Sequence, residues 1–124
     1  MDEPASRVVA IIEDDPRVRV SLADLLQSAS IAALTYSSAE EFLQSGDPKK
    51  ISCLISDVRL PGMNGVELLQ AVKQKQPELP IVLITGHRDR GVRERALQAG
   101  AAAFFYKPFS DLELLGALKA AWNG

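Results

Sequence analysis

The sequence predicts an α/β protein: a doubly wound (βα)5 domain in which helices cover both faces of a five-stranded parallel sheet. Short apolar runs alternate along the chain with segments of helical periodicity, and this alternation occurs five times. The apolar runs are rich in β-branched residues and are not interrupted by polar ones, which is typical of parallel strands buried on both faces. Five units are too few for an eight-stranded barrel. Right-handed crossovers then favour an open sheet with the strand order 2-1-3-4-5.

Five apolar runs are the predicted strands. The clearest is residues 8–12, Val-Val-Ala-Ile-Ile, and residues 51–55 and 81–84 have the same character. Residues 102–106 form a fourth run, and residues 32–36 form a weaker fifth. Each gap between consecutive runs is long enough for one helix, as a parallel sheet requires.

Capping signals mark the predicted helices. Asp15 can cap a helix that carries Pro16 in its first turn, where a missing N–H costs nothing. A fourth helix is expected from about residue 89 to residue 99, with Gly100 as its C-terminal cap and Gly91 as a weakening residue near its start. Three further pairs have capping-box spacing, the third more loosely: Ser38 with Glu41, Ser110 with Glu113, and Asn64 with Glu67.

Composition limits the class of protein. The chain has 124 residues, 47% of them hydrophobic, which predicts one folded domain over residues 1–124. The 14 basic and 16 acidic residues give a net charge of −2, which argues against direct binding of nucleic acid by this domain. One Cys and one His exclude a disulfide framework and a multi-His metal site. No apolar run approaches the roughly 18–20 residues of a membrane span and no signal peptide is evident, so a cytoplasmic location is expected.

Chemically active side chains follow four of the predicted strands. In an open parallel sheet, ligands bind at the carboxyl ends of the strands, near the point where the strand order reverses. For the order 2-1-3-4-5, that point lies between the first and third strands. The residues at these ends are Glu13-Asp14-Asp15, Ser56-Asp57, Thr85-Gly86 and Lys107-Pro108. We therefore expect carboxylates, a hydroxyl and an ammonium to meet at one edge.

This set of residue types indicates phosphoryl transfer. Carboxylates in one crevice repel one another unless a cation is present, and a site with two or three of them suits Mg²⁺. A carboxylate can attack phosphorus, while a lysine and a small hydroxyl stabilise the phosphoryl oxygens. Taken singly, each feature is more often a solvated turn, a strand exit or a surface ion-pair partner. Their coincidence at one edge favours a site, whereas His87 is expected to be a loop residue and Cys53 a buried core residue.

The chain resembles the receiver domain of two-component response regulators, most of all the FixJ-type receivers of LuxR-family regulators. The resemblance covers nearly the whole chain and implies a flavodoxin-like (βα)5 fold. The motifs that carry it are Ile12-Glu13-Asp14-Asp15, Ser56-Asp57-Val58-Arg59-Leu60-Pro61-Gly62-Met63-Asn64-Gly65, Ile84-Thr85-Gly86-His87 and Lys107-Pro108-Phe109.

The resemblance implies a role for each residue of the acidic edge. Asp57 matches the phosphoacceptor and Asp14 the direct ligand of Mg²⁺, for which Mn²⁺ can substitute. Glu13 matches the first acidic position, which acts through a metal-bound water, and it stands where Asp is commoner. The main-chain carbonyl of Arg59 matches the third protein ligand.

The resemblance also implies a switch. Thr85 matches the hydroxyl that follows the phosphoryl group, and Lys107 matches the lysine that pairs with it, with a cis Lys107-Pro108 bond. Phe104 occupies the aromatic switch position, where many receivers have Tyr. Phe lacks the hydroxyl that would anchor an outward state.

The expected function is that of a receiver that a sensor histidine kinase phosphorylates on Asp57. The face made by the fourth helix, the fifth strand and the last helix is then expected to change shape and form a homodimer that controls transcription. The charged segment at residues 88–95 is either half of that dimer surface or a solvated face. A helix-turn-helix output domain would lie beyond residue 124; otherwise the chain is a single-domain regulator.

Three other functions would also account for part of the sequence pattern. A phosphatase of the haloacid-dehalogenase type also uses an aspartyl nucleophile, but it needs a second Asp two residues later, where this chain has Arg59. A nucleotide-binding domain needs a Gly-rich loop after the first strand, where the acidic triplet would repel phosphates. A pseudo-receiver that never takes phosphate is a further alternative. We expect a phosphoacceptor domain and not a turnover enzyme.

Overall fold

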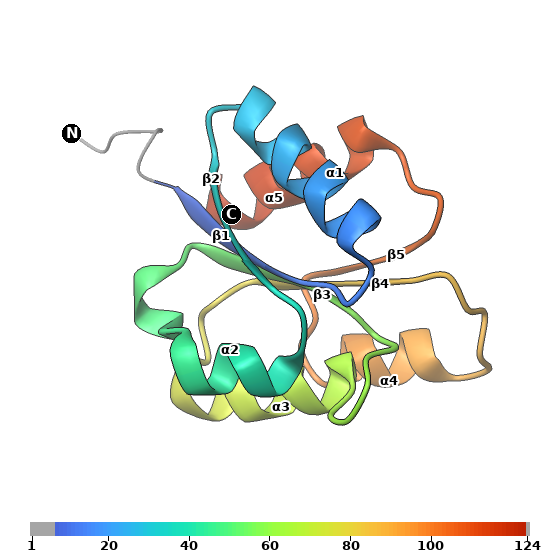
Figure 1. The fold of residues 1–124 in the computed structure, drawn as a ribbon. Helices are drawn as coiled ribbons and strands as arrows, with labels where there is room; N and C mark the ends of the chain where they lie inside the picture. Colours follow the sequence, from blue (N-terminus) through green and yellow to red (C-terminus); the bar gives the residue numbers. More distant parts are fainter. Residues whose placement is uncertain (1–6, 124) are drawn as a thin grey trace.

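The computed structural model describes residues 7–123 and contains the predicted five-stranded parallel sheet, in the order β2-β1-β3-β4-β5. The strands are β1 (Val8–Ile12), β2 (Ala32–Tyr36), β3 (Cys53–Asp57), β4 (Ile81–Thr85) and β5 (Ala103–Tyr106). The helices are α1 (Pro16–Ser28), α2 (Ala39–Ser45), α3 (Gly65–Lys75), α4 (Val92–Gln98) and α5 (Asp111–Asn123), with a 3-10 turn, η2 (Pro48–Lys50). Figure 1 shows α1 and α5 on one face of the sheet and α2, α3 and α4 on the other. Over residues 7–123, no helix has the length and apolar character needed to span a membrane.

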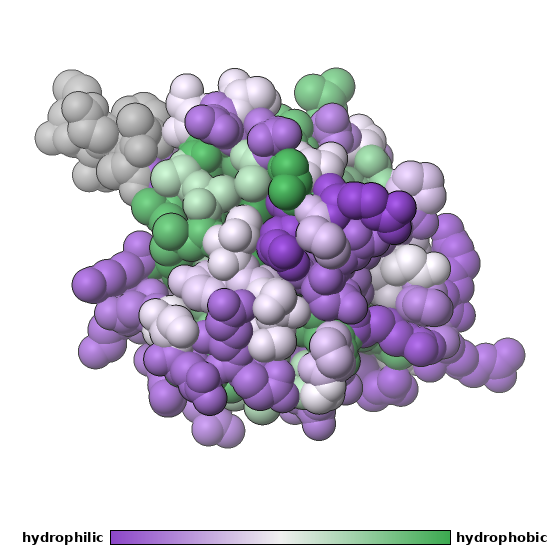
Figure 2. Space-filling view, viewed as in Figure 1, coloured by the Kyte–Doolittle hydropathy of each residue, from purple (hydrophilic) through white to green (hydrophobic). Residues whose placement is uncertain are grey.

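The sheet separates two apolar cores. Alternate residues of each strand point to opposite faces, so Val9 and Ile11 pack with α1 and α5, while Ala10 and Ile12 pack with the other three helices. β3 and β4 are buried throughout, and Cys53 is a core residue as predicted. β2 is an edge strand, and apolar residues gather over it in the space-filling view of Figure 2. The functional edge of the sheet is thus held by a rigid, doubly packed centre.

The predicted helix starts are confirmed by their hydrogen bonds. The Asp15 carboxylate accepts from the Arg17 N–H at 2.9 Å, and Pro16 occupies the first turn of α1. The loosest predicted cap is complete in the structure: the Asn64 side chain accepts from the backbone of Glu67, and the Glu67 carboxylate accepts from the backbone of Asn64. Each such cap satisfies backbone donors that the first helical turn would otherwise leave unpaired.

The fourth helix begins later than the sequence predicts. α4 starts at Val92 and not near residue 89, because Gly91 has φ +81° and so lies in the left-handed region, outside any α-helix. Gly91 is therefore not a weakening residue inside the helix but the turn that precedes it. The C-terminal cap lies one residue earlier than predicted, at Ala99, and Gly100 follows it with φ +110°, a left-handed conformation of the kind that ends helices.

The third strand is also displaced from its predicted position. It pairs over Cys53–Asp57, two residues beyond the predicted 51–55, while Ile51 is buried without being part of the strand. The shift places Ser56 and Asp57 inside the strand, where neighbouring strands restrain their backbone.

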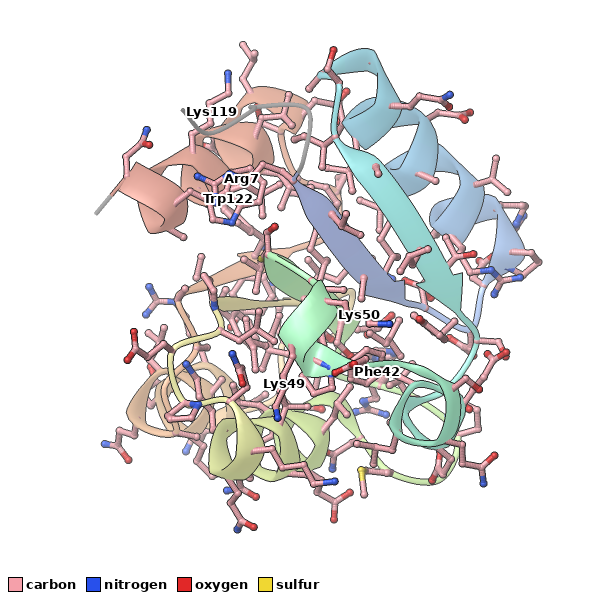
Figure 3. All side chains as sticks on the ribbon, turned by 90° about the vertical axis from the view of Figure 1, so that its left-hand side faces the viewer. Arg7, Phe42, Lys49, Lys50, Lys119 and Trp122 are labelled. Carbon is pink, nitrogen blue, oxygen red and sulfur yellow. The ribbon has the colours of Figure 1, made fainter. Side chains whose placement is uncertain are left out.

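The end of the sheet at which β1 begins is closed by the last turn of α5. The Trp122 indole N–H donates to the Ser52 carbonyl at 2.8 Å, and the Arg7 guanidinium lies 4.7 Å from the centre of the Trp122 ring. Figure 3 shows Arg7 and Trp122 side by side at this end. α5 is thus attached to the loop before β3 by a half-buried aromatic residue.

Candidate functional site

Three carboxylates meet where β1 and β3 end. Glu13 and Asp14 follow β1, Asp57 ends β3, and the two strands are neighbours in the sheet. One carboxylate oxygen from each residue lies within 4.8 Å of the others. Glu13 and Asp57 are buried and Asp14 is exposed. The structure therefore brings the two acidic segments together, although Asp14 and Asp57 are 43 positions apart in the chain.

Lys107 bridges the two buried carboxylates. Its ammonium lies 2.7 Å from Asp57 Oδ2 and 2.8 Å from Glu13 Oε1, and 24% of its side chain is exposed. Burial works to lower the pKa of Lys107, but the hydrogen bonds to Asp57 and Glu13 outweigh burial and raise that pKa above its usual value. The lysine is therefore held as a cation against the acidic cluster. The Lys107-Pro108 bond is cis, as the resemblance implies.

Glu13 is the most deeply buried carboxylate of the cluster, with 1% of its surface exposed. Burial raises its pKa above the usual value, and the nearby Asp57 adds to that effect. The hydrogen bonds from Lys107 and from the Asp15 backbone N–H, the latter at 3.0 Å, offset burial only in part. An additional cation at this cluster would favour the ionised form of Glu13. Carboxylate oxygens of this number suit a hard divalent cation such as Mg²⁺.

The loop after Asp57 fixes the orientation of its carboxylate. The Arg59 N–H donates to Asp57 Oδ1 at 2.9 Å, and the Gly65 N–H donates to the Val58 carbonyl at 2.9 Å. Gly65 packs so closely that a Cβ there would lie 2.4 Å from the Asp57 carbonyl oxygen. The backbone of Arg59 thus lies beside the Asp57 carboxylate, and the role of its carbonyl as a metal ligand stays a prediction.

The residues predicted to form a switch lie on the neighbouring strands. Thr85 ends β4 with 1% of its surface exposed, and its hydroxyl oxygen accepts from the His87 N–H at 3.1 Å. The Lys107 N–H donates to the Thr85 carbonyl at 2.7 Å, which joins the threonine to the lysine. Phe104 on β5 is half-buried against the core that faces α4, and its ring meets Tyr106 edge-on at 5.3 Å. Thr85 therefore ends β4, while Phe104 and Lys107 lie on the neighbouring strand β5 and directly after it.

Two contacts near the site have no counterpart in the sequence patterns. Arg59 forms an ion pair with Asp89, and the Arg88 guanidinium stacks 4.2 Å from the centre of the Tyr106 ring. Arg59 and Asp89 also line, together with Asp14, a cleft of about 690 Å³ between the loop after β3 and the start of α4. No local signal could have found these pairs, because their members are far apart in the chain.

The chain matches the family model described as the response regulator receiver domain over residues 9–119. It is 39% identical over 118 residues to the transcriptional regulatory protein FixJ of Azorhizobium caulinodans, covering 95% of this chain and 56% of that protein. It is 42% identical over 114 residues to nodulation protein W of Bradyrhizobium diazoefficiens, covering 92% of this chain and 50% of that protein. The crystal structure of FixJ-N superposes with a TM-score of 0.84 at 34% identity, covering 99% of this chain and 96% of the other.

The chain therefore spans about half the length of the curated relatives that it matches. The family model covers most of the chain, including the acidic cluster, Thr85 and Lys107. Together with the fold and the identities to FixJ-type regulators, this match shows that the chain belongs to the family of two-component response regulator receiver domains.

Proposed function

We propose that this chain accepts a phosphoryl group on Asp57 from a sensor histidine kinase. The observation that carries the proposal is the position of the Asp57 carboxylate, which a lysine ammonium contacts at 2.7 Å within a cluster of three acids. A carboxylate that only capped a turn would not need a partly buried cation beside it. Family membership supports the same assignment.

The acidic cluster supplies the ligands for a divalent cation, Mg²⁺ or Mn²⁺. Asp14 and Asp57 would contact the cation directly, Glu13 would act through a water, and the Arg59 carbonyl would complete the protein ligands, as the family resemblance implies. The oxygen-only donor set supports this assignment. When bound, the cation neutralises negative charge on the phosphoryl oxygens.

The protein's own groups then act around the transferred phosphorus. One Asp57 oxygen forms a bond to the phosphorus as the bond from phosphorus to the donor's imidazole nitrogen breaks. That nitrogen leaves with the electron pair of the broken bond and takes up a proton from the solvent. Lys107 is positioned to donate to a phosphoryl oxygen, because its ammonium already contacts Asp57. The Thr85 hydroxyl lies at the end of the strand beside β3 and is the second donor.

The output of the domain follows from the movement of Thr85 and Lys107 toward the new charge. Both residues are connected to β5, so the face made by α4, β5 and α5 changes with them. Phe104 is the aromatic residue of this switch. We propose that the altered face forms a homodimer, and that in a longer protein a helix-turn-helix domain beyond residue 124 then controls transcription.

Incubation with acetyl phosphate and Mg²⁺, followed by intact mass measurement, tests the acceptor. The wild type is expected to gain the mass of one phosphoryl group. Asp57→Asn is expected to gain no mass, and Asp14→Ala is expected to gain one phosphoryl group much more slowly than the wild type. An unmodified wild type would support a pseudo-receiver, and an Asp57→Asn variant that still gains the group would place the acceptor elsewhere. Continuous turnover of a phosphomonoester would favour the phosphatase alternative instead.

Light scattering with and without acetyl phosphate tests the dimer. A mass that doubles in the wild type but not in Asp57→Asn supports dimerisation through phosphorylation. An unchanged mass in a sample that intact mass shows to be phosphorylated removes the dimer from the proposal.

A further inference from the structure

The Arg59 side chain lines the cleft beside the acidic cluster and forms an ion pair there with Asp89. Its Nη2 lies 2.5 Å from Asp89 Oδ2, although the two residues are 30 positions apart. Both side chains are about half exposed, and both line the cleft together with Asp14. The ion pair therefore connects the loop that follows Asp57 to the segment that precedes α4.

Few other contacts hold the segment at residues 86–91. α4 has seven residues, and its N-cap residue, Gly91, provides no side-chain hydrogen bond. The backbone bond from Val92 to the Asp89 carbonyl is long, at 3.4 Å. Among the described residues, three side-chain contacts tie this segment to its neighbours: the Thr85 hydroxyl accepts from the His87 N–H at its start, Arg88 stacks on Tyr106, and Asp89 pairs with Arg59. The pair with Arg59 is the contact that joins the segment to the loop after Asp57.

Phosphorylation of Asp57 would place a second anionic partner beside the backbone of Arg59. The Arg59 backbone N–H already donates to Asp57 Oδ1 at 2.9 Å. The Arg59 side chain therefore extends from backbone that lies directly beside the acceptor carboxylate. A guanidinium binds a phosphoryl group through two parallel hydrogen bonds, and a phosphoryl group carries about −1.5 to −2 charge against −1 for a carboxylate. An exposed ion pair is weak, so little free energy opposes the exchange.

We propose that the Arg59 guanidinium is a further phosphoryl-binding group of this receiver, and that Asp89 holds it away from the site until Asp57 is phosphorylated. This inference rests on the proposed function of Asp57. When Arg59 moves to the phosphoryl oxygens, Asp89 loses its partner and the segment at residues 86–91 is released. Asp89 and the phosphoryl group thus compete for one arginine. We call the Arg59–Asp89 ion pair the latch.

A double-mutant cycle tests the exchange in the full 124-residue chain. The probe is beryllium fluoride with Mg²⁺, a mimic of the phosphoryl group, and its apparent affinity is followed from the NMR signal of the Gly91 amide. Asp89→Asn is expected to tighten binding about three-fold, the size expected from loss of an exposed pair. Arg59→Gln is expected to weaken binding, and the double variant to behave as Arg59→Gln alone. That lack of additivity is the signature of one shared arginine.

Glu94→Gln is the matched control, since it removes one negative charge from α4 at a residue with no ion pair in the described part of the chain. It should leave the affinity unchanged. The inference is overturned if Asp89→Asn tightens binding equally in the Arg59→Gln background, or if Glu94→Gln reproduces its effect, because either result would mean that general electrostatics suffice. If the wild type neither binds the mimic nor gains mass from acetyl phosphate, the proposed function itself is contradicted. If the wild type binds the mimic but the effects of Asp89→Asn and Arg59→Gln on affinity add, only the latch is contradicted.

Discussion

The ammonium of Lys107 and the carboxylate of Glu13, which are 94 positions apart in the chain, lie 2.8 Å apart in the fold. The same ammonium contacts Asp57 at 2.7 Å. One cation therefore compensates two buried acids in the absence of a metal. Because the cluster has more negative than positive charge, both its stability and its affinity for cations depend on these two contacts.

Lys107→Met is expected to destabilise the metal-free protein by about 2 kcal/mol. A fully buried ion pair that loses one partner costs about 3–5 kcal/mol, and the effect here is smaller because 24% of the Lys107 side chain is exposed. Mg²⁺ should restore more stability to this variant than it adds to the wild type, since the cation replaces the lost ammonium. Thermal unfolding with and without Mg²⁺ measures both effects. Equal stabilisation of the two proteins by Mg²⁺ would contradict the bridging role.

Glu13→Gln is expected to stabilise the metal-free protein and to weaken metal binding. The raised pKa of Glu13 means that the fold disfavours its ionised form, so stability from this group is fully present below the carboxyl's unfolded pKa and is lost as pH rises through its folded pKa. At neutral pH, a neutral amide should therefore raise the melting temperature, by about 4 °C for each 1 kcal/mol in a domain of this size.

Calorimetric titration of the same Glu13→Gln variant with Mg²⁺ should show an affinity about ten-fold lower than that of the wild type, as for other residues that act through a metal-bound water. The substitution should therefore raise the melting temperature of the metal-free protein and lower its affinity for Mg²⁺. A variant that loses stability and keeps its metal affinity would show that Glu13 is only a structural partner of Lys107.

Gly65→Ala is expected to disturb the acceptor loop, whereas Gly116→Ala is not. A Cβ at Gly65 would meet the Asp57 carbonyl oxygen at 2.4 Å and the Val58 Cα at 2.9 Å, and both atoms belong to backbone that cannot move aside easily. Overpacking of this kind costs about 1–3 kcal/mol and should slow phosphorylation by acetyl phosphate. At Gly116, inside α5, nothing lies within 4 Å, so alanine should stabilise the helix by about 0.5–1 kcal/mol.

Chemical denaturation and the rate of mass gain from acetyl phosphate separate the two glycines. The Gly116→Ala variant is the control for the loss of backbone freedom, which both substitutions share. A Gly65→Ala variant as stable and as reactive as Gly116→Ala would show that the loop after Asp57 tolerates displacement.

Cys53 is expected to resist alkylation in the folded protein. Burial raises the pKa of this thiol from 9.0 to about 12, so the reactive thiolate is scarce below that pH and the side chain is inaccessible. Iodoacetamide at pH 8 should modify the chain only after unfolding by denaturant, as intact mass would show. Rapid modification under native conditions would mean that β3 opens, and the free energy of that opening follows from the rate.

Local patterns in the sequence determined most of the architecture. The apolar runs located the strands, the capping residues located the helix starts, and right-handed crossovers allowed the strand order to be inferred. The edge that carries Glu13, Asp14 and Asp57 could be named in advance, because carboxyl ends of parallel strands share one side of the sheet. Backbone propensities and the alternation of apolar residues depend on residues only a few positions apart. Strands and helices can therefore be predicted from one sequence.

Tertiary structure alone decided which side chains of the loops pair with one another. The pairing of Arg59 with Asp89 and the stacking of Arg88 on Tyr106 depend on the paths of the loops that carry Arg59, Arg88 and Asp89. The late start of α4 has the same origin, since the conformation of Gly91 is chosen by the packing around it. Such contacts carry little free energy each and leave no periodic trace in the sequence, because many loop paths are compatible with the same strands and helices.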